Sequence, residues 1–387
     1  MEKLVKLFRR ETLTTEFIPV IDGLRFLAIA MVVLFHCSPT TRYPGENYLP
    51  FGHQGVQLFF VISGFVLAMP FLRLGLGLTQ KKLPLKKYFK RRLTRLEPPY
   101  IISIGLIFLL LAIFSRDKLP LSDLLASLGC SYLYINNFVF PGKLPLINRV
   151  TWSLEIEVQY YLIAPFIVAG FCLLKSKITR RVVILASIFV FGVVSWWMET
   201  VEQFPLLILP RYLQYFLAGV LLCEIYLLDR DALQKLNNIF IFGLGLVLLM
   251  VLIFVEHSIS PYFGLKVGSP FMILAFYLIV FGNSWWTRVF SLRPVTLIGG
   301  MCYSIYLLHA QVIAGVDRLM RAVLPADGFY FHYVIETMIF CTAILVLCGL
   351  FFLFIEKPCM NPNWVSDLKM YLRGISTKRR EAAAERA

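Results

Sequence analysis

The first apolar run of the chain carries residue types that can move a proton inside a membrane. In IPVIDGLRFLAIAMVVLFHC (residues 18–37), Asp22 and Arg25 are one helical turn apart and can pair. His36 follows on nearly the same helix face, about 16 Å farther along the axis. That face then presents a guanidinium at one depth and an imidazole, the usual general base near neutral pH, at another. The alternative is that His36 only marks the end of the span.

Two carboxylates lie close together in TWSLEIEVQYYL, residues 151–162. Glu155 and Glu157 are about 200° apart on a helix, so only one of them can face a given cavity. Glu157 is the candidate catalytic residue, because polar and aromatic side chains lie one turn away from it. The candidate substrate-binding residues here are Trp152, Ser153, Tyr160 and Tyr161. The alternative is a structural ion pair, for example with Arg149 or Arg211.

Three arginines gather in KKYFKRRLTRLEPPY, residues 86–100, at the start of another apolar run. Arg91, Arg92 and Arg95 fall within about one turn, and arginine forks bind phosphate bidentately. They are therefore candidates for binding a phosphate-bearing co-substrate. The alternative is the excess of positive charge that cytoplasmic loops ordinarily carry.

Three further motifs carry a weaker signal. Ser63 and Gly64, in GVQLFFVISGF, are interpreted as small residues that permit close helix packing. His309, at the end of YSIYLLH, is either a second substrate-pocket residue or a hydrogen-bonded structural histidine. In FIEKP, Glu356 and Lys357 are interpreted as anchoring the last helix at the membrane interface. The sequence has no zinc-type spacing, Walker loop or GxSxG elbow, so we expect no metal site.

The elements that position these residues are expected to be membrane helices. The chain is 58% hydrophobic and 16% charged, whereas soluble domains are about 45–50% apolar and about 25% charged. We predict an all-α, polytopic integral membrane protein with about ten spans. Their approximate cores are 18–37, 56–72, 98–114, 151–174, 182–198, 207–228, 239–255, 270–282, 295–315 and 333–355. The eighth is short and opens with Pro270, so it is expected to extend further or to be broken.

The chain has a net charge of +15, and the distribution of its Lys and Arg residues along the chain fixes the expected orientation. Most Lys and Arg residues lie in short segments on the side of the N-terminus, which predicts that both termini are cytoplasmic. This also removes the reason to expect a nucleic-acid partner. The expected parts are a basic cytoplasmic N-terminus (1–17), a membrane domain (18–358) and a cytoplasmic tail (359–387). The outer segment 115–150 is long, and we expect it to form a functional or re-entrant element.

Taken in order, these motifs resemble the acyltransferase-3 family of membrane O-acyltransferases. The resemblance rests on IDGLRFLAIAMVVLFH, GVQLFFVISGF, KRRLTRLEPPY, TWSLEIEVQYY, YSIYLLH and FIEKP, which together span nearly the whole chain. It implies that His36 is the essential histidine and Arg25 the motif arginine. It also implies that Arg92 and Arg95 form the basic RxxR-type motif, and that Glu157 is the motif glutamate.

The resemblance also implies a reaction. Members take an acyl group, with acetyl the expected one, from cytoplasmic acyl-CoA and deliver it to a hydroxyl of a cell-surface carbohydrate or glycolipid. The expected location is the bacterial inner membrane, among membrane lipids. Some members carry a further SGNH hydrolase-like domain. This chain is expected to lack it, and either to complete the transfer or to pass the acyl group to a separate protein. The acceptor, the acyl chain length and the oligomeric state are not predicted.

A transporter or flippase of lipid-linked saccharides is the alternative from another functional class. Ten spans with buried charges fit that class equally well on physical grounds. Many transporters show inverted repeats, however, and this sequence shows none.

Overall fold

The structure is a computed structural model. It describes residues 8, 10, 17–37, 52–81, 84–115, 119–200, 207–254, 263–323, 329–361 and 364. Every regular element among these residues is helical, as predicted. Most of the expected N-terminal part (1–17) and of the expected tail (359–387) lies outside the described residues.

Within the described residues, seven helices are long and apolar enough to cross a membrane: α2 (Pro19–Cys37), α3 (Gly52–Gly75), α4 (Leu85–Phe114), α7 (Trp152–Leu173), α8 (Lys177–Thr200), α13 (Phe263–Gly282) and α17 (Phe329–Phe351). An eighth span results if the bent pair α15 (Arg293–Gly300) and α16 (Cys302–Val323) is taken as one. The predicted sixth and seventh spans are shorter helices, α9 (Leu213–Leu228) and α11 (Ile239–Phe254). The chain is therefore a multi-pass membrane protein.

Shorter elements connect these helices: α5 (Leu121–Leu133), α6 (Asn136–Val139), η2 (Arg149–Thr151), η3 (Leu209–Arg211), α10 (Arg230–Gln234), α14 (Ser284–Phe290), η4 (Phe352–Glu356) and α18 (Lys357–Cys359). The predicted outer segment 115–150 contains α5, α6 and the start of η2. It is tied to α4, since the hydroxyl of Tyr100 donates to the carbonyl of Ser131 over 3.0 Å.

The eighth predicted span extends towards its N-terminus and is not broken. Helix α13 begins at Phe263 and carries Pro270 inside it. A proline lacks the N–H that would bond to the carbonyl four residues earlier, here that of Lys266. The hydroxyl of Ser269 lies 3.4 Å from this carbonyl and donates to it, so the helix continues.

The ninth predicted span, 295–315, is a pair of helices with a bend between them. Helices α15 and α16 meet at 72°, next to Gly299 and Gly300. A Cβ atom on Gly299 would lie 1.7 Å from the carbonyl oxygen of Asp22. The bend therefore places glycine backbone directly against α2, at the level of the Asp22–Arg25 pair.

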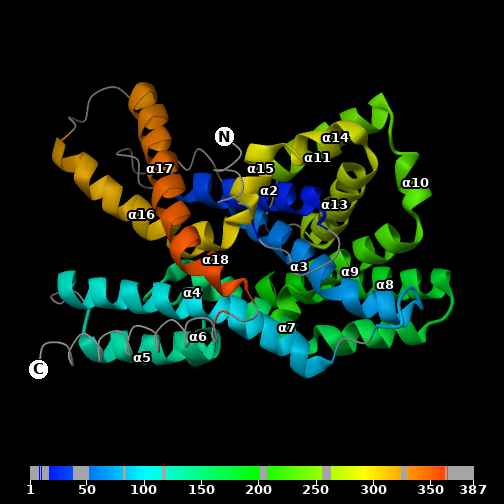
Figure 1. The fold of residues 1–387 in the computed structure, drawn as a ribbon, viewed down its shortest axis with the longest axis horizontal. Coiled ribbons are helices and arrows are strands. Elements are labelled where there is room, and N and C mark those ends of the chain that lie inside the picture. Colours follow the sequence, from blue (N-terminus) through cyan, green and yellow to red (C-terminus); the bar gives the residue numbers. More distant parts are fainter. Residues whose placement is uncertain are drawn as a thin grey trace, which may run out of the picture.

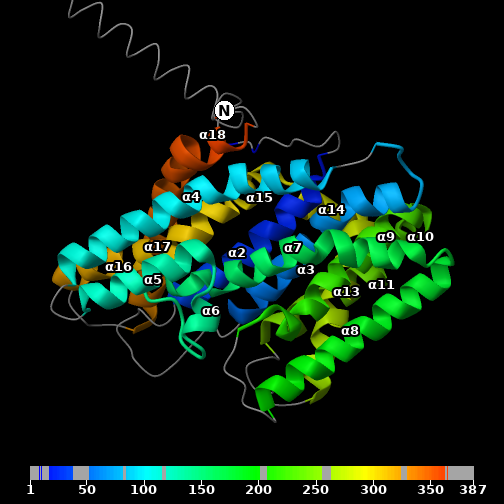
Figure 2. The same cartoon turned by 90° about the horizontal axis from the view of Figure 1, so that it is seen from below.

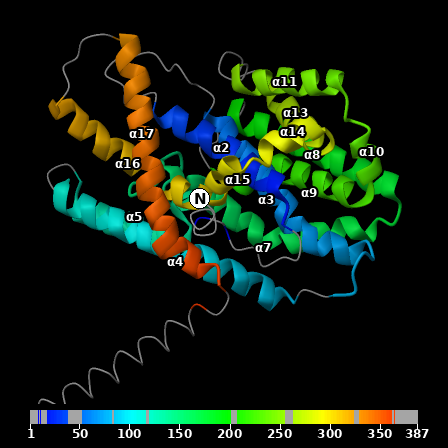
Figure 3. The ribbon, with the colours of Figure 1, turned by 45° about the horizontal axis from the view of Figure 1, so that its top comes forward.

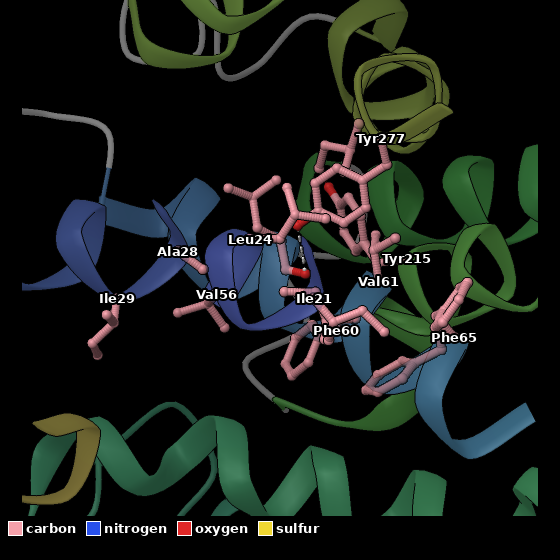
Figure 4. Close-up of a cluster of buried hydrophobic side chains, with 14 of the residues drawn as sticks. Ile21, Leu24, Ala28, Ile29, Val56, Phe60, Val61, Phe65, Tyr215 and Tyr277 are labelled. Carbon is pink, nitrogen blue, oxygen red and sulfur yellow. Dashed lines mark hydrogen bonds between the residues drawn. The ribbon is translucent and has the colours of Figure 1, made fainter. Parts of the chain in front are cut away.

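Helices α2 and α3 form the centre of the molecule (Figure 1). In Figures 1 and 2 they lie between α16 and α17 on one side and α8, α9, α11 and α13 on the other. Side chains from α2, α3, α9 and α13 meet in one buried cluster, which includes Leu24, Val61, Tyr215 and Tyr277 (Figure 4). The hydroxyl of Tyr277 donates to the carbonyl of Leu58 over 3.2 Å.

Close helix crossings hold this centre together. A Cβ on Gly64 would lie 2.1 Å from the carbonyl oxygen of Phe216, and one on Gly219 would lie 2.1 Å from that of Val61. The packing interpretation of Gly64 is thus confirmed. On the opposite side, η4 and α18, which follow α17, contact α4 (Figure 3).

Candidate active site

A cavity of about 390 Å³ lies between α2, α3, α4, α7, α16 and η4. This volume falls in the range of small-molecule sites, roughly 300–1,000 Å³. We call the part lined by Arg10, Arg25, Arg92 and Arg95 the arginine end. We call the part lined by Val56, Phe59, Ser153 and Tyr306 the tyrosine end. The stretch between them is largely apolar, so the cavity suits a ligand with an anionic head and a long, mostly uncharged arm.

Asp22 organises part of the arginine end. Its Oδ1 atom lies 2.5 Å from Nη1 of Arg25 and 3.2 Å from Nη1 of Arg10, and the carboxylate is only 3% exposed. The predicted pairing of Asp22 with Arg25 is confirmed. Arg10 comes from the segment before α2, and its buried Nε atom has no hydrogen-bond partner among the described residues.

Positive charge is in excess at this end. Burial, together with the neighbouring guanidinium groups of Arg25 and Arg95, lowers the pKa of Arg10 to about 9. Such crowding disfavours the charged form of a base, and a nearby anion relieves it. The arginine end is therefore a favourable place for phosphate groups.

Arg92 is held between aromatic rings. Its guanidinium carbon lies 5.9 Å from the ring centroid of Tyr88 and 5.8 Å from that of Tyr161. The hydroxyl of Tyr88 donates to the carbonyl of Tyr161 over 3.2 Å, which ties α4 to α7. Cation–π contacts at both rings limit the orientations that the guanidinium can adopt.

Glu157 lines the cavity from the second turn of α7. It accepts a hydrogen bond of 2.5 Å from the hydroxyl of Ser63, on α3. Ser63 therefore lines the cavity as well, beside the packing residue Gly64.

Glu155 has a structural role instead. It is fully buried, and its carboxylate accepts from the backbone N–H groups of Asn136 and Asn137 over 3.2 and 2.8 Å. It caps the start of α6, where a negative charge is favourable. The two glutamates thus face different surroundings, as their spacing predicts, although the partners of Glu155 are amides and not Arg149 or Arg211.

The tyrosine end is fixed by a chain of hydrogen bonds. The hydroxyls of Ser153 and Tyr306 lie 2.6 Å apart, and the Tyr306 hydroxyl donates to the carbonyl of Val150 over 2.6 Å. The ring of Tyr306 is 6.0 Å from that of His309, centroid to centroid. Tyr306 thus lines the cavity and lies next to His309, which does not line it.

His36 and His309 lie side by side, and His309 is the one next to this tyrosine. Nε2 of His309 is 3.3 Å from Nδ1 of His36, and the rings meet edge to face with centroids 4.9 Å apart. His309 is fully buried, whereas His36 is half-buried. The structure brings together two histidines that are far apart in the sequence.

The predicted site residues divide into two groups. The cavity lining includes Arg25, Arg92, Arg95, Ser153, Glu157 and Tyr161. Among the described residues, this lining does not include Arg91, Trp152, Tyr160, His36 or His309. Trp152 packs on Tyr212 with centroids 5.5 Å apart, and Tyr160 is fully buried and stacks on Phe216 at 4.1 Å.

Sequence reasoning missed three charged residues of the cavity, Arg10, Glu97 and Glu356. The sequence predicts that Glu356 anchors the last helix at the membrane interface. It is instead 1% exposed and accepts from the backbone N–H and the hydroxyl of Ser304, over 3.1 and 2.5 Å. The cost of a carboxylate within an apolar run was the signal that could have identified it. Arg10 lies in the basic N-terminal segment, where its charge alone does not distinguish it from the other Lys and Arg residues.

Comparisons with known proteins agree with these motifs. The family model described as "Acyltransferase domain", for the acyltransferase-3 family, matches residues 18–353. The O-acetyltransferase OatA of Staphylococcus aureus (strain NCTC 8325 / PS 47) is 26% identical over 368 residues, which cover 88% of this chain and 57% of that protein. The peptidoglycan O-acetyltransferase OatA of Listeria monocytogenes serovar 1/2a is 24% identical over 393 residues, which cover 94% of this chain and 58% of that protein.

The chain therefore spans a little over half the length of these curated relatives. No solved structure matches it. The family match covers most of the chain and includes α2, α3, α4, α7 and α16, the helices that enclose the cavity. The chain belongs to the acyltransferase-3 family of membrane O-acyltransferases.

Proposed function

We propose that the protein transfers an acyl group, with acetyl the expected one, from acyl-CoA to a hydroxyl of a cell-surface carbohydrate. The observation that carries this proposal is the cavity that runs from the arginine end to Tyr306. Tyr306 lies next to His309, and His309 contacts His36. An arginine-lined, mostly apolar cavity thus ends at Tyr306, the residue that contacts His309.

The donor is acyl-CoA in this proposal, bound with its phosphates at the arginine end. Four guanidinium groups line that end, from Arg10, Arg25, Arg92 and Arg95, and arginine forks match phosphate oxygens. The uncharged arm of the donor then extends past Glu157 towards Tyr306. Ser63 fixes the Glu157 carboxylate there, which suits it to orient the polar groups of the arm.

His36 acts as the general base in this proposal. It takes the proton of the acceptor hydroxyl while the acceptor oxygen attacks the thioester carbonyl, forming the new ester bond. The carbon–sulfur bond breaks, and the coenzyme A thiolate leaves and receives the proton from the imidazolium. An acyl-histidine intermediate is the less favoured variant. Neither histidine lines the cavity, so access of His36 to the thioester requires Tyr306 or its neighbours to move.

The orientation that we propose places both termini and the arginine end on the cytoplasmic side, with His36 towards the opposite face. The positions of Lys and Arg support it. In this arrangement α9 and α11 also cross or enter the bilayer, which gives about ten passes through a membrane domain at residues 18–358, flanked by cytoplasmic parts at 1–17 and 359–387. The membrane in this proposal is the bacterial plasma membrane, because acyl-CoA is supplied from the cytosol and this membrane faces the cytosol.

The acceptor class is inferred from relatives. The Listeria monocytogenes relative is named as a peptidoglycan O-acetyltransferase, which makes a cell-wall glycan the proposed acceptor. The outer element α5 contacts α4, and α6 contacts α7, so both pack against helices that line the cavity and are placed to influence acceptor choice.

The test uses the purified protein reconstituted in liposomes with acetyl-CoA labelled in the acetyl group. We expect release of free thiol and appearance of label on added glycan-strand fragments. Movement of a lipid-linked saccharide across the bilayer, without thiol release, would contradict the enzyme and indicate a transporter.

A further inference from the structure

The hydrogen bonds of His309 determine which of its nitrogens carries a proton. Its Nδ1 atom lies 3.0 Å from the carbonyl oxygen of Ile305 and 2.9 Å from that of Tyr306. Carbonyl oxygens only accept hydrogen bonds, so Nδ1 must be the N–H donor. In the neutral imidazole the lone pair is then on Nε2, which faces His36.

The same reasoning applies to His36. Its Nδ1 atom lies 2.8 Å from the carbonyl oxygen of Val32 and 3.3 Å from Nε2 of His309. Both of these atoms accept, so the proton of neutral His36 is on Nδ1 and its lone pair is on Nε2. A general base needs its lone pair directed away from the group that orients it, and this arrangement provides that.

We propose that His309 is a positioning residue that holds His36 in the base-competent tautomer and stabilises the imidazolium formed when His36 accepts a proton. The inference rests on the proposed function, in which His36 is the base. His309 thereby takes the part that a carboxylate takes in a catalytic triad, where the third group orients the imidazole. It does so without placing a second charge in the low-dielectric interior, where an isolated carboxylate is costly.

The surroundings of His309 suit this role and not direct substrate contact. It is fully buried and does not line the cavity, whereas the neighbouring Tyr306 does. Helix α16 supplies both the Nδ1 acceptors and the ring, so its backbone sets the angle at which Nε2 meets His36. Of the two roles that the sequence left open for His309, the hydrogen-bonded structural one agrees better with these surroundings, and it includes the orienting of His36 in this proposal.

The experiment compares His309→Leu with His309→Gln in the liposome assay with acetyl-CoA and glycan-strand fragments. Leucine removes the acceptor, whereas the glutamine side-chain oxygen reaches the place of Nε2. We expect the leucine variant to lose kcat by about 10- to 100-fold, the usual cost of losing an orienting partner, with KM for acetyl-CoA changed less than about twofold. The glutamine variant should regain most of this loss.

A second arm places His309→Leu in a His36→Ala background, where it should cost nothing more, because the two residues act as one unit. Unchanged kcat in His309→Leu, equal impairment of both variants, or an additive loss in the double variant would each overturn the proposal. Failure of the proposed function is distinguishable from these outcomes, since wild-type protein would then release no thiol from acetyl-CoA.

Discussion

The hydroxyl of Ser63 on α3 donates to Oε1 of Glu157 on α7 over 2.5 Å, and both residues line the cavity. Two motifs that are distant in the sequence thus meet at the cavity wall. The motif that contains Ser63 and Gly64 therefore has two roles. Gly64 allows α3 to pack closely against α9, and Ser63 contacts α7 at the candidate site.

Changing Glu157→Gln should lower kcat/KM for acetyl-CoA by about tenfold or more, because a hydrogen bond to a charged group is worth about 1.5–3 kcal/mol. Steady-state thiol release measures this. Ser63→Ala leaves the charge in place and should cost less. Glu155→Gln serves as the matched contrast: it should reduce thermal stability in detergent through the loss of its charged cap on α6. Equal activity in Glu157→Gln and wild type would remove Glu157 from the mechanism.

Changing Arg92→Gln or Arg95→Gln should raise KM for acetyl-CoA by about tenfold, since each change removes a charge-assisted phosphate contact. Acetyl-pantetheine, which lacks the nucleotide phosphates, should be used equally well by the variants and by wild type. Arg91→Gln is the control, because Arg91 belongs to the same basic segment but lies outside the described lining of the cavity. If Arg91→Gln and Arg92→Gln behaved alike, only the general positive charge of the segment would matter.

Changing Arg10→Gln should weaken binding of coenzyme A to the purified protein several-fold, as expected for one charged contact of about 1.5 kcal/mol. The reason is that Arg10 adds a further guanidinium to the arginine end and shares Asp22 with Arg25. Calorimetric titration with coenzyme A measures the effect. An affinity equal to that of wild type would show that Arg10 only neutralises Asp22.

Changing Gly299→Ala should destabilise the protein, because the new Cβ would lie 1.7 Å from the carbonyl oxygen of Asp22. Backbone must shift to relieve this contact, at a cost of about 1–3 kcal/mol, and the Asp22–Arg25 pair shifts with it. Gly315→Ala on α16 is the matched control, since its Cβ would meet nothing within 4 Å. Thermal unfolding in detergent compares them. The account of the α15–α16 bend fails if both variants unfold at the wild-type temperature.

The sequence predicted well what depends on apolar runs and on spacing along a single helix. The long spans, the Asp22–Arg25 pair and the division of roles between Glu155 and Glu157 all follow from these features. The bend at Met301 depends on α2 backbone that contacts Gly299, so no local pattern in the sequence shows it.

Contacts between distant segments were the part that sequence reasoning could not supply. His309 meets His36 only because α16 packs against α2, and Glu356 reaches the cavity only because η4 contacts α4. Tyr160 and Tyr161 are neighbours in one motif, yet Tyr160 stacks on Phe216 and Tyr161 lines the cavity. Successive residues of a helix point about 100° apart, so neighbours such as these face different surroundings. The packing of the surrounding helices then decides which of the two residues lines the cavity.

The most direct test of the central claim is acetyl transfer by a His36→Ala variant that is confirmed to insert in the membrane and to bind coenzyme A as wild type does. General-base catalysis contributes about 100-fold or more, so we expect thiol release and glycan labelling to fall by at least that factor while donor binding is retained. Undiminished turnover in this variant would contradict the role assigned to His36.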